Sequence, residues 1–383
     1  MPGMVQTGLE RLVEADGGEL KGRKVGLITN PTGILADGTS GIEALRGVGV
    51  KLGALFGPEH GVRGDVPAGK YIPNYTDAKT GLTAYSLYGK TRQPTAAMLR
   101  GLDALAFDLQ DIGARSYTYL SSLGEVLKAS AIHKIPVFVL DRPNPCGGVR
   151  VEGGPTRAGF TSFISKYPTA YLHGLTLGEA ARLMVGEGWV GKAELTVISC
   201  ANLTRTMVWP DFERPRWVPT SPNVPKWETA LLYAATGIIG ELPSVSIGIG
   251  VPGSQFALCG APGIDGQKLA AQLSTIPNWK FTPESWTPAK GVHAGKRCTG
   301  VRLTMTDPQK AVLCRLNFAL LAALRNLPHF SSGEETRMFD LSCGTDAVRR
   351  AYQKGASEAD LWAEFQRGVD GFAKKRQKYL LDS

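Results

Sequence analysis

Carboxylates that could perform acid–base chemistry follow two apolar segments of the chain. Glu59 lies in the tetrapeptide PEHG, where Pro58 and Gly61 bracket it directly after a predicted strand. Asp108 and Asp111 end the apolar run LDALAFDLQD. Glycoside hydrolysis needs two carboxyl groups, one that protonates the leaving oxygen and one that acts on the oxocarbenium side. The sequence therefore offers Glu59, Asp108 and Asp111 as candidate catalytic residues, with Glu59 as the proton donor.

Asp111 also has a plainer interpretation. An acid at the end of a strand often caps the helix that follows, and Arg115 is close enough along the chain to pair with it. Both interpretations stay open from this stretch alone.

Other chemistries have less support in the sequence. No serine occurs in a G-x-S-x-G motif and no cysteine has a suitable partner, which disfavours nucleophilic acyl transfer. The histidines show no metal-ligand spacing, so no catalytic metal is predicted. Residues Gly248–Gly253 fit the dinucleotide fingerprint G-x-G-x-x-G, but no helix start follows them. We therefore expect no cofactor.

The elements that must position the candidate acids alternate between strand and helix. Buried strands are predicted at Lys24–Asn30, Val50–Gly57, Ala104–Leu109, Pro136–Asp141 and Glu194–Cys200. Helical segments between them predict βαβ units, and so an α/β fold with a Rossmann-like, mostly parallel sheet. Parallel strands bring their carboxyl ends to one edge, where open α/β sheets bind ligands. The polar residues expected at that edge are Asn30, Glu59, Asp108, Asp111, Asp141 and Arg142.

The pattern changes near residue 240. Regular alternation gives way to a predicted strand at Val301–Thr306 and predicted helices at Pro308–Leu324 and Glu358–Lys375. A chain of 383 residues is long for one hydrophobic core. We expect a catalytic domain over residues 1–240 and a smaller α+β auxiliary domain over residues 241–383, with the substrate in the cleft between them.

Composition limits the partners that the chain can have. The net charge of +9 suits an acidic substrate, a membrane surface or nucleic acid. Lysine and arginine are spread thinly except at Lys374–Lys378, a cluster typical of a helix carboxyl end, so no nucleic-acid partner is expected. No apolar run of about 18 residues predicts a membrane span. The chain shows no secretory signal, and the cysteines lack C-x-x-C spacing.

Three long motifs resemble the NamZ (YbbC-type) family of bacterial exo-β-N-acetylmuramidases. They are FGPEHGVRGD (Phe56–Asp65), LAFDLQDIGARSYTY (Leu105–Tyr119) and VLDRPNPCGG (Val139–Gly148), and the likeness extends over nearly the whole chain. The resemblance implies a Rossmann-like domain joined to a smaller carboxyl-terminal domain. It also implies release of N-acetylmuramic acid from the non-reducing ends of peptidoglycan fragments, without metal or nucleotide, in a periplasmic or secreted location. The sequence leaves a cytoplasmic location open.

Candidate substrate-binding residues combine strand ends, a polar loop and positions that match the family motifs. They are Asn30, His60, Arg63, Gln110, Arg115, Tyr117, Asp141, Arg142, Asn144, Asn223 and Glu241. A substrate with a lactyl carboxylate would give Arg63, Arg115 and Arg142 a purpose, because arginine binds carboxylates through two parallel hydrogen bonds.

One segment departs from the family pattern. Where a motif like EGTN-x-S-x-GRGT is expected, Glu241 is kept, but Ile249 and Val251 replace its arginine and threonine. Ala257 replaces the acid of a PFE motif. Two rival hypotheses therefore stay open, a non-catalytic binder of cell-wall fragments and a β-glycosidase for another amino sugar. The sequence also leaves open the oligomeric state and the choice between retaining, inverting and substrate-assisted mechanisms.

Overall fold

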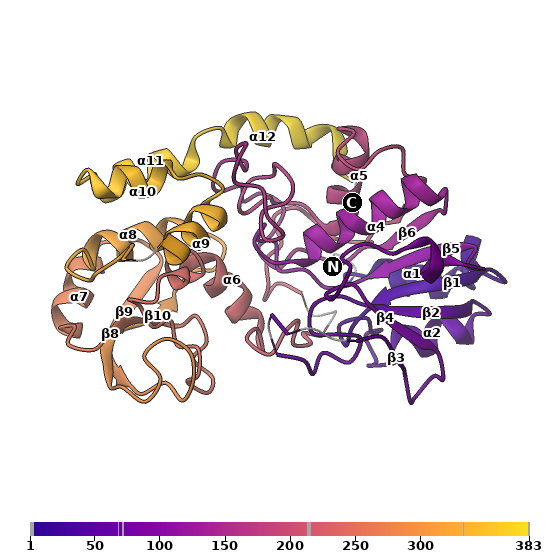
Figure 1. Cartoon of the computed structure of the whole chain (residues 1–383), viewed down its shortest axis with the longest axis horizontal. Coiled ribbons are helices and arrows are strands. Elements are labelled where there is room, and N and C mark those ends of the chain that lie inside the picture. The colour runs from indigo at the N-terminus through magenta and orange to yellow at the C-terminus, as the bar shows by residue number, and fades with distance from the viewer. Residues whose placement is uncertain (1–3, 68, 71–72, 213–215, 332, 382–383) are drawn as a thin grey trace.

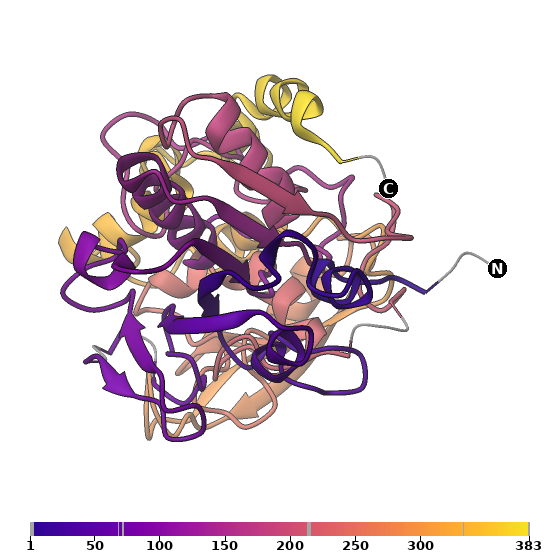
Figure 2. The ribbon, with the colours of Figure 1, turned by 90° about the vertical axis from the view of Figure 1, so that its right-hand side faces the viewer.

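Two sheets of different size organise the protein (Figure 1). The computed structural model describes residues 4–67, 69–70, 73–212, 216–331 and 333–381. Seven strands form the larger sheet, in the order β3-β4-β2-β1-β5-β6-β7, and three form the smaller one, in the order β8-β10-β9. Both ends of the described chain lie on the same side of the molecule (Figure 2).

The larger sheet is the Rossmann-like sheet that the sequence predicts. Its strands are β1 (Lys24–Thr29), β2 (Lys51–Gly57), β3 (Tyr75–Thr76), β4 (Thr83–Ser86), β5 (Ala104–Asp108), β6 (Val137–Leu140) and β7 (Leu195–Ile198). All pairings are parallel except that of the edge strand β3 with β4. The chain builds outward from β1 through β2 and β4, then returns to add β5, β6 and β7 on the other side. The strand order therefore reverses between β1 and β5, which is where such sheets bind ligands.

Helices cover both faces of this sheet. Leu27 and its neighbours on one face pack against α1 (Gly8–Glu14) and α2 (Gly41–Gly47). Ile28 and the residues that share its face pack against α4 (Tyr119–His133) and α5 (Leu177–Gly186). Adjacent residues of β1 thus point into opposite cores, as the period of two in a strand requires. The strands of the sequence analysis are confirmed as β1, β2, β5, β6 and β7, although β7, at the edge of the sheet, is only half-buried.

The second half of the chain forms the smaller antiparallel sheet and a set of helices. Its elements are α6 (Trp227–Thr236), η2 (Ile239–Glu241), β8 (Leu258–Ala261), α7 (Gly266–Leu273), β9 (Trp279–Trp286), β10 (Cys298–Met305), α8 (Arg315–Ala323), α9 (Gly333–Cys343), α10 (Ala347–Gln353), α11 (Glu358–Gln366) and α12 (Val369–Arg376). The chain then returns to the larger sheet (Figure 1), where the Tyr379 hydroxyl donates to Glu187 at 2.8 Å. The division at residue 240 stays a prediction.

Local chemistry explains why one predicted helix begins later than expected and another is divided in two. The helix expected over Pro308–Leu324 begins only at Arg315, because Asp307 Oδ1 first accepts the amides of Gln309 and Lys310 in a turn. The helix expected over Glu358–Lys375 breaks at Gly368, whose φ of 93° no helical residue adopts. Within the described residues, no helix is long and apolar enough to cross a membrane.

Candidate active site

The polar strand ends meet at the carboxyl edge of the larger sheet, but several bind one another. Asp108 Oδ1 lies 2.5 Å from Arg142 Nε, and both side chains are buried. Burial raises the pKa of Asp108, and the charge of Arg142 opposes that rise. Gly33 has to be a glycine, because a Cβ there would lie 2.8 Å from Asp108 Oδ2. Asp108 and Arg142 therefore form an internal ion pair at the switch point, and the catalytic and substrate-binding roles expected for them stay predictions.

Little room remains above this ion pair. Trp209 and Trp217 cover it, and the cavity between them and Arg142 holds about 10 Å³. Such a space admits at most one water molecule. A saccharide does not fit at this point of the edge.

Asp141 and Asn144 fold the DRPNP loop onto the start of α5. Asp141 accepts hydrogen bonds from the Gly178 amide at 2.8 Å and from the Thr176 hydroxyl at 2.6 Å. Burial raises the pKa of Asp141 to about 7. Asn144 Nδ2 donates to the Leu175 carbonyl at 2.9 Å. Both residues thus position the loop, and their predicted contact with substrate stays untested.

Asn30 and Gln110 connect the loops that follow β1, β5 and β6. Asn30 Nδ2 donates to the Tyr119 hydroxyl at 2.8 Å, and Asn30 Oδ1 accepts from the Thr32 amide at 2.9 Å. Gln110 Nε2 donates to the Pro143 carbonyl at 2.7 Å. Both amides are buried. They fix the relative positions of three strand ends.

Arg115 does not pair with Asp111. Its guanidinium is fully buried and donates to four carbonyl oxygens, those of Gly154, Thr169, Ser342 and Cys343, at 2.7–3.1 Å. Burial lowers its pKa to about 10, so it stays charged at neutral pH. The last two carbonyls belong to the end of α9. Arg115 therefore fastens the second half of the chain to the larger sheet.

Arg63 is also occupied within the protein. Its guanidinium forms two hydrogen bonds with Asp77, at 2.9 and 2.7 Å, and so ties the loop after β2 to the β3–β4 turn. Arg63, Arg115 and Arg142 thus all have protein partners. That this group also binds a substrate carboxylate stays a prediction.

Asp111 faces a neutral histidine. Its Oδ2 accepts from the Gly113 amide at 2.8 Å and lies 3.8 Å from His173 Nε2. His173 Nδ1 accepts from the Leu175 amide at 3.2 Å, which leaves the ring proton on Nε2. Burial raises the pKa of Asp111 to about 7 and lowers that of His173 to about 3. The pKa of Asp111 therefore lies near neutral pH, whereas His173 stays uncharged there.

Glu59 is the strand-end acid that stays partly exposed. Its Oε2 accepts from the Thr118 hydroxyl at 2.8 Å and its Oε1 from the Gly69 amide at 3.0 Å. Its loop is fixed as the sequence suggests, because His60 adopts a φ of 73° and its Nδ1 lies 2.8 Å from the Val66 carbonyl oxygen. His60 is buried, and so holds the loop from within. Glu59 is immobile and accessible, as a proton donor must be.

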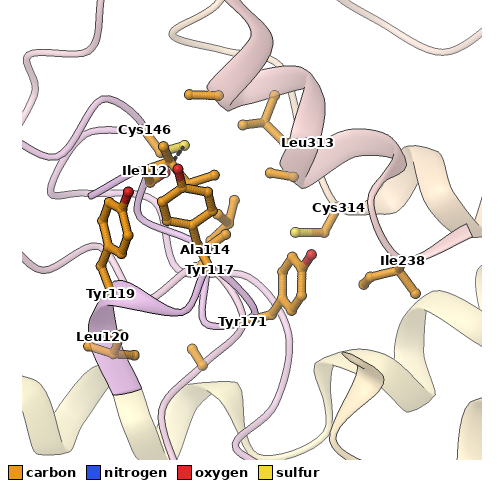
Figure 3. Packing of buried hydrophobic residues seen from close by; sticks show 14 of the residues in the cluster. Ile112, Ala114, Tyr117, Tyr119, Leu120, Cys146, Tyr171, Ile238, Leu313 and Cys314 are labelled. Atoms are coloured by element: carbon orange, nitrogen blue, oxygen red, sulfur yellow. Dashed lines mark hydrogen bonds between the residues drawn. The ribbon is translucent and has the colours of Figure 1, made fainter. Parts of the chain in front are cut away.

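Tyrosines form a wall beside Glu59. Figure 3 shows Tyr117 and Tyr119 side by side, with their hydroxyl groups pointing the same way, and their ring centres are 4.8 Å apart. The Tyr117 hydroxyl donates to Thr220 Oγ1 at 2.9 Å and the Tyr119 hydroxyl to the Thr220 carbonyl at 2.6 Å. The wall continues to Tyr233 on α6, 6.0 Å from the ring of Tyr117.

Tyr233 connects the acids of the two halves of the chain. The negative charges of Glu59 and Glu241 both raise the pKa of its hydroxyl, to which burial contributes most. Glu241, at the end of η2, accepts from the Ser342 hydroxyl at 3.3 Å, and burial raises its pKa to about 7. Asn223 is half-buried in the turn that the Val224 amide closes onto the Ser221 carbonyl at 3.0 Å. The charges of Glu59 and Glu241, from the two halves of the chain, thus both act on Tyr233.

Several residues of this region were missed in the sequence. Tyr233 lies on a helix that carries no motif, Thr118 precedes α4, and Tyr88 and Arg92 follow β4. Strand β4 was not predicted, so its polar end was not counted with the others. The available signal in the sequence was the change from the polar Thr83 to the apolar Ala84. In the structure Thr83 is exposed and Ala84 is buried.

The departures from the family motif fall on packing positions. Val251 packs against Leu258 and Trp286 in the smaller sheet, and Ala257 is buried. The Gly250 carbonyl beside Ile249 accepts from the Ala289 amide at 2.9 Å. Among the residues that the structure describes, no group of three or more histidine, cysteine or acidic side chains could hold a metal ion.

Comparisons with known sequences cover almost all of the chain. The family model described as exo-β-N-acetylmuramidase NamZ, N-terminal, matches residues 25–228, and the corresponding C-terminal model matches residues 231–381. A protein of Bacillus subtilis (strain 168), peptidoglycan β-N-acetylmuramidase NamZ, is 38% identical over 381 residues, covering 98% of this chain and 91% of that protein.

Two crystal structures from Bacteroides fragilis NCTC 9343 have the same fold. Both are of DUF1343 family proteins, and each comparison covers 99% of both chains. One is 36% identical with a TM-score of 0.91, and the other is 29% identical with a TM-score of 0.81. The likeness therefore extends over both sheets.

Proposed function

Because the chain belongs to the exo-β-N-acetylmuramidase NamZ family, we propose that it is an exo-acting glycoside hydrolase. It releases N-acetylmuramic acid from the non-reducing ends of peptidoglycan fragments. The structural observation that carries the proposal is Glu59, a partly exposed carboxyl group held by Thr118 and the Gly69 amide beside a wall of tyrosines. Peptidoglycan lies outside the cytoplasmic membrane, so a periplasmic or secreted location is part of the proposal.

Glu59 acts as the general acid. Its proton passes to the glycosidic oxygen as the bond from that oxygen to the anomeric carbon breaks, and positive charge develops on the sugar ring. The two hydrogen bonds to Glu59 restrict the rotation of its carboxyl group. That restriction keeps the proton aimed at one position and reduces the entropy lost on reaching the transition state.

Two further carboxyl groups can serve the sugar side of the bond. Asp111 lies on the same sheet edge as Glu59, and we assign it the second catalytic role, that of stabilising the charged ring or orienting the acetamido group. Glu241 comes from the other half of the chain and its charge acts on Tyr233, so we assign it to substrate binding. Burial brings the pKa of both to about 7, which allows either protonation state near neutral pH.

Incubation with 4-nitrophenyl β-N-acetylmuraminide tests the proposal. Release of nitrophenol, together with release of N-acetylmuramic acid from a natural disaccharide, is the expected result. Binding without release would favour a non-catalytic receptor for wall fragments. Faster turnover of another aryl glycoside in a small panel would identify a different amino sugar as the substrate.

A further inference from the structure

Arg92 is a cation beside the candidate active site for which the described residues provide no carboxylate partner. It follows β4, which pairs in parallel with β2 so that Ser86 lies opposite Gly57. Tyr88 and Glu59 each come two residues after these strand ends and therefore emerge side by side. Burial raises the pKa of Tyr88 most and the charge of Glu59 raises it further, whereas a hydrogen bond with Arg92 and the charge of Arg92 lower it. Arg92 is thus a near neighbour of Glu59.

Two aromatic rings hold the guanidinium of Arg92. Its Cζ lies 3.6 Å from the ring centre of Tyr88 and 4.3 Å from that of Phe163, which belongs to a separate loop. Thr91 stiffens the backbone next to it, because its hydroxyl donates to the Gln93 carbonyl at 2.7 Å and accepts from the Gln93 amide at 3.1 Å. Stacking occupies the faces of a guanidinium and leaves its N–H groups, which lie in the plane, for a ligand.

The donors of Arg92 differ from those of the other arginines at this edge. Arg63 and Arg142 pair with carboxylates, and Arg115 donates to carbonyls. Arg92 Nη1 is buried and has no hydrogen-bond partner among the described residues. A buried charged donor without an acceptor is unfavourable, and a bidentate carboxylate removes that cost most completely. An anionic group of the ligand fits the position.

We propose that Arg92 binds the lactyl carboxylate of the substrate and so selects N-acetylmuramic acid over neutral N-acetylhexosamines. This inference rests on the proposed function and adds the residue that recognises the lactyl group of the sugar. Tyr88 and Phe163 fix the guanidinium, and Glu59 acts on the glycosidic oxygen of the same sugar. The sequence suggested Arg63, Arg115 and Arg142 for this contact, and all three have protein partners in the structure.

The test compares two substrates that differ only in charge, the 4-nitrophenyl β-N-acetylmuraminide with a free lactyl carboxylate and its methyl ester. Arg92→Gln should lower kcat/KM for the acid about 100-fold, mainly through KM, because a charge-assisted bidentate contact is lost. For the ester the same variant should stay within about 3-fold of the parent protein. For the acid, kcat/KM of Arg92→Lys should lie between that of the parent protein and that of Arg92→Gln. Lysine keeps the positive charge but cannot form two parallel hydrogen bonds with one carboxylate.

Lys90→Gln is the matched control, because Lys90 is exposed and lies in the same loop. It removes the same charge and should leave both substrates unaffected. Equal losses on acid and ester in Arg92→Gln would overturn the proposal and show a purely structural role, and no loss on the acid would also overturn it. If Arg92→Gln did not fold, equal kcat/KM of the parent protein for acid and ester would overturn it. A parent protein that hydrolysed neither substrate would instead refute the proposed function.

Discussion

The strand ends at the centre of the larger sheet and those at its β2–β4 side differ in what their polar residues do. At the centre, Asp108, Asp141 and Arg142 are buried and bind one another or nearby backbone. At the side, Glu59 is partly exposed, and Arg92 stacks on the rings of Tyr88 and Phe163. The same sequence pattern, a polar residue after an apolar strand, thus produces buried internal contacts in one region and an accessible carboxyl group in the other.

Burial accounts for the difference. The centre of the edge is covered by Trp209 and Trp217, so a charge there is stable only when it is paired. The β2–β4 side lies near the edge of the sheet, where side chains reach solvent. Substitutions at the centre should therefore mainly lower stability, and substitutions at the β2–β4 side should mainly lower activity.

The largest expected effect comes from breaking the central ion pair. Arg142→Met leaves Asp108 buried without its partner and should lower the free energy of unfolding by about 3–5 kcal/mol. Urea denaturation of the variant and the parent protein measures the loss. The double variant Asp108→Leu with Arg142→Met is the control, because an apolar pair removes the uncompensated charge and should recover much of the stability. An unchanged stability in Arg142→Met would contradict the structural role of the pair.

A sequence pattern identifies elements better than it identifies partners. The apolar runs before Asn30, Glu59 and Asp108 were sufficient to predict β1, β2 and β5, because a buried parallel strand has a distinctive composition. The partner of Arg142 lies 34 positions earlier at Asp108, and one partner of Arg115 lies 228 positions later at Cys343. Only the assembled fold brings such residues together.

The missed strands explain the missed site residues. Strand β4 has four residues and β3 two, too few for a periodic pattern to stand out. Without β4, the position of Tyr88 and Arg92 beside Glu59 could not be anticipated. The motif residues were therefore found, while the residues that surround Glu59 were not.

A smaller effect concerns the pH dependence of stability. Burial raises the pKa of Asp111 from 3.8 to about 7, so the folded protein keeps a proton that the unfolded chain releases. The stability from this proton is complete below about pH 4 and is lost as the pH rises towards 7. Asp111→Asn keeps a neutral side chain and should become more stable relative to the parent by up to about 1.4 kcal/mol per pH unit across this window.

Urea denaturation between pH 4 and 8 provides the comparison. A constant difference between Asp111→Asn and the parent protein over this range would show that Asp111 is ionised when folded. Such a result would contradict the rise in the pKa of Asp111 that burial produces.

The smallest effect is expected for the loop that carries Glu59. Arg63→Lys loses the two-pronged contact with Asp77 that holds this loop, and kcat/KM should fall about 10-fold through displacement of Glu59. The free energy of unfolding should change by less than about 1 kcal/mol, because the Arg63 side chain is 31% exposed. Arg46→Lys, at another exposed arginine near the β3–β4 turn, is the control and should leave kcat/KM unaltered. A larger loss of stability than of activity would contradict this prediction. It would show that Arg63, like Arg142 at the centre of the sheet, mainly stabilises the fold.

The assignment of Glu59 as the general acid is tested most directly by its leaving-group dependence. Glu59→Gln keeps the shape of the side chain and removes its acidic proton, so hydrolysis of a natural disaccharide should fall by about 10²–10⁴-fold. Hydrolysis of the 4-nitrophenyl glycoside should fall less, because nitrophenolate leaves without protonation, whereas Asp111→Asn should slow both substrates alike. An unchanged melting temperature would establish that the variants are folded. Turnover of the disaccharide by Glu59→Gln at the parental rate would contradict the assignment and direct attention to Glu241.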